Sequence, residues 1–116
     1  MNQTKLGITA LALTLTVLSC TSYNAFHKAK TAEQSKDWDQ AVVEYQKAID
    51  AGDHSFIPYV NLATAYALQG KMDEAKAALS KGRRLNPKLT VKWLIAHAPD
   101  VLPLLEGLRK AGLREE

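Results

Sequence analysis

The side chains able to bind a metal ion are few and scattered along the 116-residue chain. A zinc site needs three or four converging histidine, cysteine or carboxylate ligands. The three histidines are His27, His54 and His97. His27 has no such residue three or four positions away, and Gly52 and Pro99 separate the other two histidines from the carboxylates at helical spacing. The sequence therefore predicts no metal ion and no other cofactor.

Patterns that would support catalysis are missing as well. The pair Gly70-Lys71 lacks the earlier glycine and the strand of a phosphate-binding loop. Acidic residues gather at expected helix starts, where the helix dipole accounts for them: Asp37, Asp39, Asp73 and Glu74. We therefore expect that the protein is not an enzyme.

Cys20 is the only cysteine of the chain, so it cannot form an internal disulfide. One cation, Lys5, and an apolar run over residues 6–18 precede it, and Ser19 places a small residue directly before it. A charged start, a short apolar stretch and a small residue are the layout of a secretory signal peptide. The run falls short of the roughly 20 apolar residues that a membrane-spanning helix needs. Residues 1–19 are therefore interpreted as a signal peptide.

The string Val17-Leu18-Ser19-Cys20 resembles the lipobox of bacterial lipoproteins. The resemblance implies cleavage before Cys20 and attachment of lipid, such as palmitate, to that residue. It implies the bacterial cell envelope, and Thr21, in place of the aspartate linked to inner-membrane retention, favours an outer membrane lipoprotein facing the periplasm. Plain secretion and an uncleaved anchor are the alternatives. Residues 20–22 would form a lipidated anchor reaching roughly 10 Å at most, so the domain should lie against the bilayer.

The sequence repeats itself at an offset of 34 residues, which predicts a repeat architecture. Residues 37–41, Asp-Trp-Asp-Gln-Ala, align with residues 71–75, Lys-Met-Asp-Glu-Ala. The second copy resembles the tetratricopeptide repeat family at these positions: Tyr59, Leu62, Ala63, Tyr66, Ala75, Leu79, Gly82 and Pro87. The first copy, residues 22–55, matches less closely, as an end repeat does. The resemblance implies an all-α fold, with two helix-turn-helix repeats in residues 23–87 and a role in binding other proteins.

Hydrophobic spacing and helix-stop residues predict the individual helices at about 23–35, 38–51, 56–69 and 72–84. One apolar stripe is formed by Trp38, Val42, Tyr45 and Ile49. Gly52 and Gly70 fall where helices should stop, Ser55 is a candidate N-cap, and Pro58 suits a first turn. Small residues should allow close helix approach: Ala41, Ala48, Ala63 and Ala75.

Residues 88–116 are predicted to form C-terminal capping helices. Two repeats alone bury too little surface to be stable, so an additional element is physically required. We expect a helix over residues 91–97, with Trp93 and Leu94 facing inward, and a second helix over residues 101–111.

In the tetratricopeptide repeat family, the first helix of each repeat lines a concave groove that binds the partner. The resemblance therefore implies contacts with a partner at Phe26, Lys30, Gln34, Asn61, Thr64 and Leu68. The amide at the position of Asn61 is often used in this family to hold a ligand backbone. For the apolar members of this set, simple packing in the core is the alternative interpretation.

Basic and acidic residues are nearly balanced, with a formal net charge of +3, so the charge does not predict a nucleic-acid ligand. Cations do gather locally, at Lys81, Arg83, Arg84, Lys88 and Lys92. Some of these cations would complement the negative C-terminal end of a helix. The alternative explanation for the cluster is attraction to an anionic lipid or to an acidic partner.

The leading functional hypothesis is a membrane-anchored adaptor that binds a peptide or helix of another envelope protein. The alternative is a structural module of an envelope complex that associates with further copies of itself.

Overall fold

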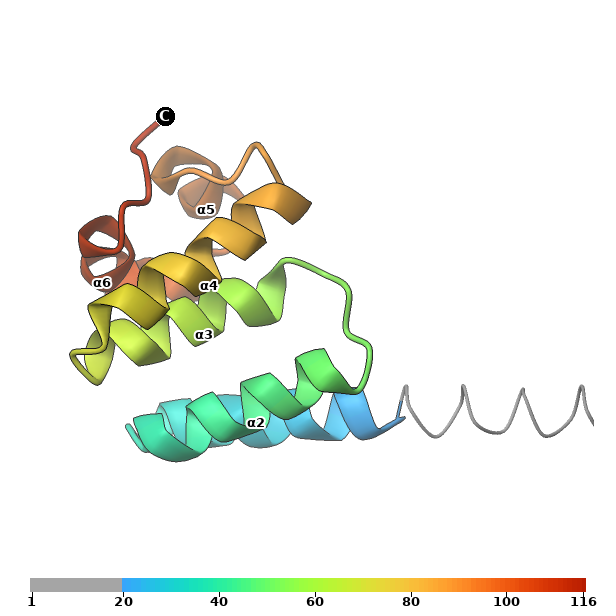
Figure 1. The fold of residues 1–116 in the computed structure, drawn as a ribbon. Helices are drawn as coiled ribbons and strands as arrows, with labels where there is room; N and C mark the ends of the chain where they lie inside the picture. Colours follow the sequence, from blue (N-terminus) through green and yellow to red (C-terminus); the bar gives the residue numbers. More distant parts are fainter. Residues whose placement is uncertain (1–19) are drawn as a thin grey trace, which may run out of the picture.

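The computed structural model describes residues 20–116, apart from the side chains of Asp100 and Pro103. An N-terminal helix covering residues 20–34 is followed by α2 (Trp38–Asp50), α3 (Ile57–Leu68), α4 (Met72–Leu85), α5 (Val91–His97), a 3₁₀ helix η1 (Pro99–Leu104) and α6 (Leu105–Lys110). Consecutive long helices run antiparallel and stack as pairs (Figure 1). Within residues 20–116 no strand is present, and the all-α prediction is confirmed. The predicted signal peptide, residues 1–19, lies outside the described residues.

The turns that end these helices share one hydrogen-bond pattern. The N–H of Asp37 donates to the carbonyl of Ala32, and the N–H of Lys71 donates to the carbonyl of Tyr66, both over 2.9 Å. Each bond closes a turn through a residue with positive φ, namely Lys36 at 59° and Gly70 at 79°. These two positions are separated by the repeat offset of 34 residues, so the internal repeat of the sequence is also a repeat of backbone geometry.

Helix starts agree with the predictions only in part. The side chain of Asp37 accepts a hydrogen bond from the N–H of Gln40 over 3.2 Å and caps α2. The predicted N-cap Ser55 is wrong: α3 begins after Phe56, without a side-chain cap. The hydroxyl of Ser55 instead donates to the carboxylate of Asp53 over 2.7 Å, which holds the loop before the helix. Pro58 does lie in the first turn of α3.

The core is formed where small residues let the helices approach. The side chains of Ala41, Ala48, Ala63 and Ala75 are fully enclosed, as predicted, and Tyr45, Leu62 and Leu79 fill the space between them. A methyl group built on Gly82 would lie 3.5 Å from the side chains of Tyr59 and Val60. The second helix pair is therefore in close contact along its length.

Residues 20–22, predicted as a lipidated anchor before a helix that starts at residue 23, already belong to the N-terminal helix. The Ser22 hydroxyl donates to the carbonyl of Ala48 over 3.2 Å and ties this first turn to the end of α2. The folded part therefore extends to Cys20, and no extended spacer separates that residue from the domain.

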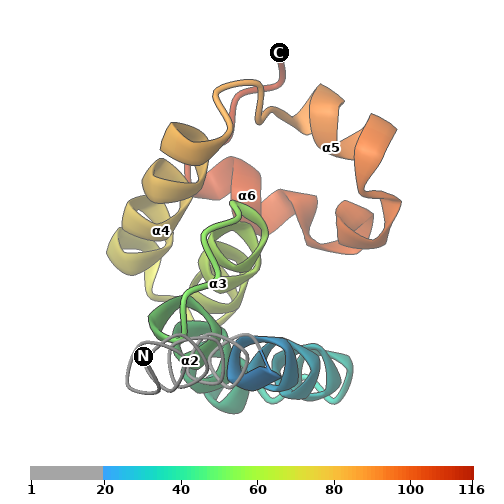
Figure 2. The same ribbon diagram turned by 90° about the vertical axis from the view of Figure 1, so that its right-hand side faces the viewer.

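The C-terminal segment folds back onto α3. Figure 2 shows α6 beside α3, and α6 also contacts α4. Leu105, Leu108 and Leu113 are buried in the shared core. The end of the chain then crosses the start of α5, where the N–H groups of Val91 and Lys92 donate to carbonyls of Arg114 and Glu115.

The single helix predicted over residues 101–111 is divided in two. Residues 99–104 form 3₁₀ turns, and only Leu105–Lys110 is α-helical. The reason is in the sequence: the residue before a proline is disfavoured in the α conformation, and Leu102 directly precedes Pro103, so the α-helix begins only after this point.

Candidate functional site

A groove of about 310 Å³ lies between the N-terminal helix, the first turns of α3 and the C-terminal segment. Its lining is mostly apolar and aromatic, with three polar side chains among them. The lining residues are Phe26, Lys30, Phe56, Ile57, Val60, Asn61, Trp93, Leu94, His97, Ala98 and Val101. Such a composition suits a ligand that buries apolar side chains and makes a few directed hydrogen bonds.

Asn61 is the polar residue that the groove leaves unsatisfied. It is only 4% exposed, it lies on α3 between the buried Val60 and Leu62, and it lines the groove. Among the described residues its side-chain amide makes no hydrogen bond. The one fully buried side-chain nitrogen or oxygen atom without a partner in this part of the chain is Oε1 of Gln69, so the amide of Asn61 is not sealed in the core but reaches the solvent of the groove. Asn61 therefore offers a donor and an acceptor, held in one place, to whatever enters the groove.

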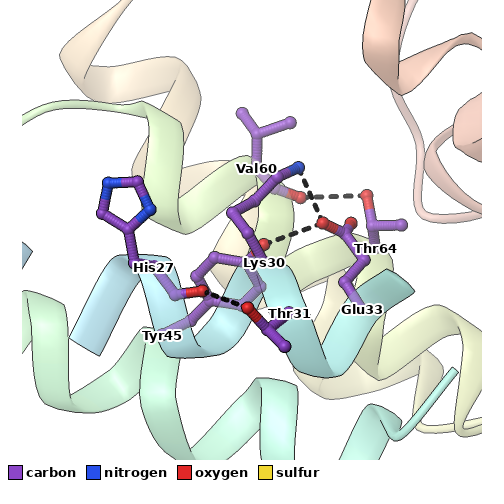
Figure 3. A network of polar contacts seen from close by, with 7 residues as sticks. All are labelled: His27, Lys30, Thr31, Glu33, Tyr45, Val60 and Thr64. Carbon is purple, nitrogen blue, oxygen red and sulfur yellow. Dashed lines mark hydrogen bonds and ion pairs between the residues drawn. The ribbon is translucent and has the colours of Figure 1, made fainter. Parts of the chain in front are cut away.

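Lys30 is held at the edge of the groove by a network of three side chains (Figure 3). Its ammonium lies 2.7 Å from Oε2 of Glu33, and the phenol of the buried Tyr45 donates to the same oxygen over 3.0 Å. Burial, and secondly the negative charge of Glu33, raise the pKa of the Tyr45 phenol far above its usual range. The phenol therefore stays protonated, fixes Glu33, and through it fixes Lys30.

The aromatic side chains of the groove support one another. Phe56 packs edge-on against Trp93, with ring centroids 5.4 Å apart, and the His97 ring stacks on Trp93 at 4.4 Å. Nδ1 of His97 lies 2.9 Å from the carbonyl oxygen of Trp93. Because a carbonyl only accepts hydrogen bonds, Nδ1 carries the proton in this arrangement, and Nε2 remains as an acceptor for another donor.

A model of the tetratricopeptide repeat family matches residues 32–97, more than half of the chain. The chain belongs to this family. Comparison with curated proteins and with solved structures found no match. Tetratricopeptide repeats are a non-catalytic fold that binds other proteins, which agrees with a groove that displays binding groups.

The structure brings together three of the residues that the sequence assigned to partner contact. Phe26, Lys30 and Asn61 all line the groove of the tetratricopeptide repeat protein. Gln34 and Leu68 are exposed but lie outside its lining.

The predicted partner contact at Thr64 is wrong. Thr64 is 1% exposed, and its hydroxyl donates to the carbonyl of Val60 over 3.1 Å (Figure 3). It is not accessible to a partner. The physical reason is the fold-back of α6, which brings Gly107 against Ala67, one helical turn from Thr64.

Sequence reasoning missed the part of the groove that the C-terminal segment supplies. Trp93, His97, Ala98 and Val101 all line it. The inward orientation predicted for Trp93 was the one signal available, but the sequence did not show which helix it would face.

The described residues contain no group of three metal-ligating side chains. In the same part of the chain, no helix is long and apolar enough to cross a membrane. Cys20, the predicted lipid attachment residue, is exposed at the start of the described N-terminal helix.

Proposed function

We propose that this tetratricopeptide repeat protein is a membrane-anchored adaptor of the bacterial cell envelope. Its groove binds a peptide segment of another envelope protein, and a lipid on Cys20 holds it at the membrane. The observation that carries the proposal is the amide of Asn61, which has no hydrogen-bond partner among the described residues and lines an apolar groove. An amide held in this way is suited to pair with the main chain of a bound peptide, whichever side chains the peptide carries.

The apolar walls supply the rest of the recognition. Phe56, Val60 and Trp93 can enclose an aliphatic or aromatic side chain of the peptide, while Lys30 at the edge favours a carboxylate. Because α6 packs against α3 at Ala67 and the lining residues of α3 are confined to its first turns, the groove is short. The bound segment is therefore a few residues long and does not run along the whole array.

The groove is tested by photo-crosslinking in the native host. Ile57 lines the groove and is 46% exposed, so it accepts a photoreactive phenylalanine analogue without loss of packing. Val43 on α2, 47% exposed and outside the groove, is the matched control. We expect a discrete adduct with another protein from position 57 and none from position 43. Equal adducts from both positions, or none from either, would refute the adaptor. An adduct with the mass of two copies would assign the groove to self-association instead.

The anchor is tested separately by labelling cells with radioactive palmitate. The native chain should incorporate label and sediment with outer membranes, and Cys20→Ser should incorporate none. Label that persists in Cys20→Ser would refute attachment at this residue.

A further inference from the structure

A second surface, on the other side of the repeat array from the groove, gathers three arginines around one hollow. We call it the basic hollow; it has a volume of about 350 Å³ and is lined by Ser80, Arg83, Arg84, Pro87 and Arg114. The first four come from α4 and the turn after it, whereas Arg114 comes from the extended C-terminal end of the chain. Residues distant in sequence thus meet at one positively charged place.

None of the three guanidinium groups has an anionic partner among the described residues. The cations that form ion pairs in this part of the chain are Lys30, Lys47, Lys92 and Arg109. The two acidic residues that follow Arg114 are engaged elsewhere. Glu115 accepts from Arg109 over 2.6 Å, and Glu116 lies 3.5 Å from Lys92. The acidic residues of α4 are in its first turn, at the opposite end of that helix.

The helix dipole explains only part of this arrangement. Arg83 and Arg84 lie in the last turn of α4, where cations are favoured. The dipole gives no reason for Arg114 to join them. Like charges around one hollow repel each other, and the repulsion is relieved when an anion enters. Guanidinium forks match the oxygens of a phosphate group, and the exposed hydroxyl of Ser80 adds one more donor.

We propose that the basic hollow binds phosphate groups of anionic phospholipids, so that the domain rests on the bilayer through the end of α4. The inference rests on the proposed membrane attachment at Cys20. The topology supports this partner: in Figure 1 the N-terminal helix begins on the same side on which α4 ends. Cys20, at the start of that helix, therefore lies on the side of the domain that carries Arg83 and Arg84.

An exposed apolar side chain supports a lipid surface over a soluble anion. Leu85, the last residue of α4, is 51% exposed and directly follows Arg84. Cations beside an exposed aliphatic side chain are typical of surfaces that lie in the interface of an anionic membrane. The hollow is also shallow, with Ser80, Arg84 and Arg114 all exposed, which suits headgroups that approach as a plane.

The test measures flotation of the full chain, carrying Cys20→Ser so that no acyl group is present, with preformed vesicles. One set of vesicles is pure phosphatidylcholine, and the other also contains phosphatidylglycerol. The variant Arg83→Gln/Arg84→Gln/Arg114→Gln is compared with Lys36→Gln/Lys71→Gln/Lys76→Gln, which removes the same charge from exposed lysines outside the hollow. Thermal melting verifies that both variants remain folded.

We expect the arginine variant to partition about tenfold or more weakly onto the anionic vesicles than the native chain, and the lysine variant to lose much less. On neutral vesicles, all three chains should bind alike. If the two variants lose affinity equally, net charge and not the hollow attracts the membrane, and the proposal is overturned. If the arginine variant binds as the native chain does, the hollow does not bind lipid, and an acidic protein becomes its ligand.

Failure of the proposed anchoring gives a different result, which is seen in the palmitate experiment and not on vesicles. The native chain would then incorporate no label. The comparison of the two variants on anionic vesicles would still decide whether the hollow binds lipid.

Discussion

At the scale of single residues, Asn61 serves binding more than stability. The residue is 4% exposed, and its amide makes no hydrogen bond within the described chain. Leucine has a similar volume, and the amide that it replaces makes no hydrogen bond that would be lost. We expect Asn61→Leu to change the free energy of unfolding by less than about 1 kcal/mol, measured by urea denaturation. The same variant should abolish the adduct formed from position 57.

A matched control is available on the N-terminal helix. Asn24 is exposed, so Asn24→Leu should change stability by less than about 0.5 kcal/mol and leave the adduct intact. If Asn61→Leu were destabilised and still formed the adduct, the amide would serve the fold and not the ligand.

Tyr45 links stability to pH. Burial and the charge of Glu33 raise the pKa of its phenol above the ordinary value of 10.0. The folded state therefore holds this proton more tightly than the unfolded state. The protonated phenol therefore contributes fully to stability below the ordinary pKa, and this contribution is lost as the pH rises above it. We expect the free energy of unfolding of the native chain to fall between about pH 9 and pH 11. For Tyr45→Phe, the free energy of unfolding should fall less steeply over the same range.

The exposed Tyr23 provides the comparison for that experiment, since it lies outside the network of Lys30, Glu33 and Tyr45. Tyr23→Phe should keep the native slope. Equal slopes for Tyr45→Phe and the native chain would contradict the role assigned to the phenol.

At the scale of the helices and turns, Lys36 occupies a position that its counterpart in the second repeat fills with glycine. Lys36 has φ of 59°, and Gly70, at the corresponding turn, has φ of 79°. Adopting this left-handed conformation costs a residue with a side chain roughly 1 kcal/mol, a cost that glycine does not have. We expect Lys36→Gly to raise the free energy of unfolding by about 0.5–1 kcal/mol, less than the full strain because glycine also loosens the unfolded chain.

The reciprocal change tests the same turn in the second repeat. Gly70→Lys should lower the free energy of unfolding by about 1 kcal/mol, although no side chain lies near the site to clash with it. No change in either variant would mean that the turn relaxes without cost.

What the sequence could predict at this scale depends on whether the cause is local. Gly52 and Gly70 end helices as expected, because a glycine in the left-handed region is a local signal. Lys36 gave no such signal, since lysine has no preference for that conformation. The burial of Thr64 and the approach of Arg114 to α4 depend on where the C-terminal segment folds back. That contact joins residues far apart in sequence, and no periodicity encodes it.

At the scale of the whole molecule, the C-terminal segment both completes the core and forms one wall of the groove. Leu108 is fully buried within this segment, whereas Leu102 is 42% exposed. Leu108→Ala leaves a cavity between α6 and the repeats, so it should lower the free energy of unfolding by about 2–5 kcal/mol. Leu102→Ala should cost less than about 1 kcal/mol. Urea denaturation followed by tryptophan fluorescence measures both.

Stability and binding should therefore fail together when this segment is weakened. Trp93 and Val101 reach the groove from the same segment, which is held to the repeats by the contact between α6 and α3. If Leu108→Ala loosens that contact, the wall formed by Trp93 is lost, and the adduct from position 57 should decrease even under conditions where α2–α4 stay helical. A variant destabilised by this amount with undiminished adduct would show that the repeats alone bind the partner. The segment would then serve only to cover the end of the array.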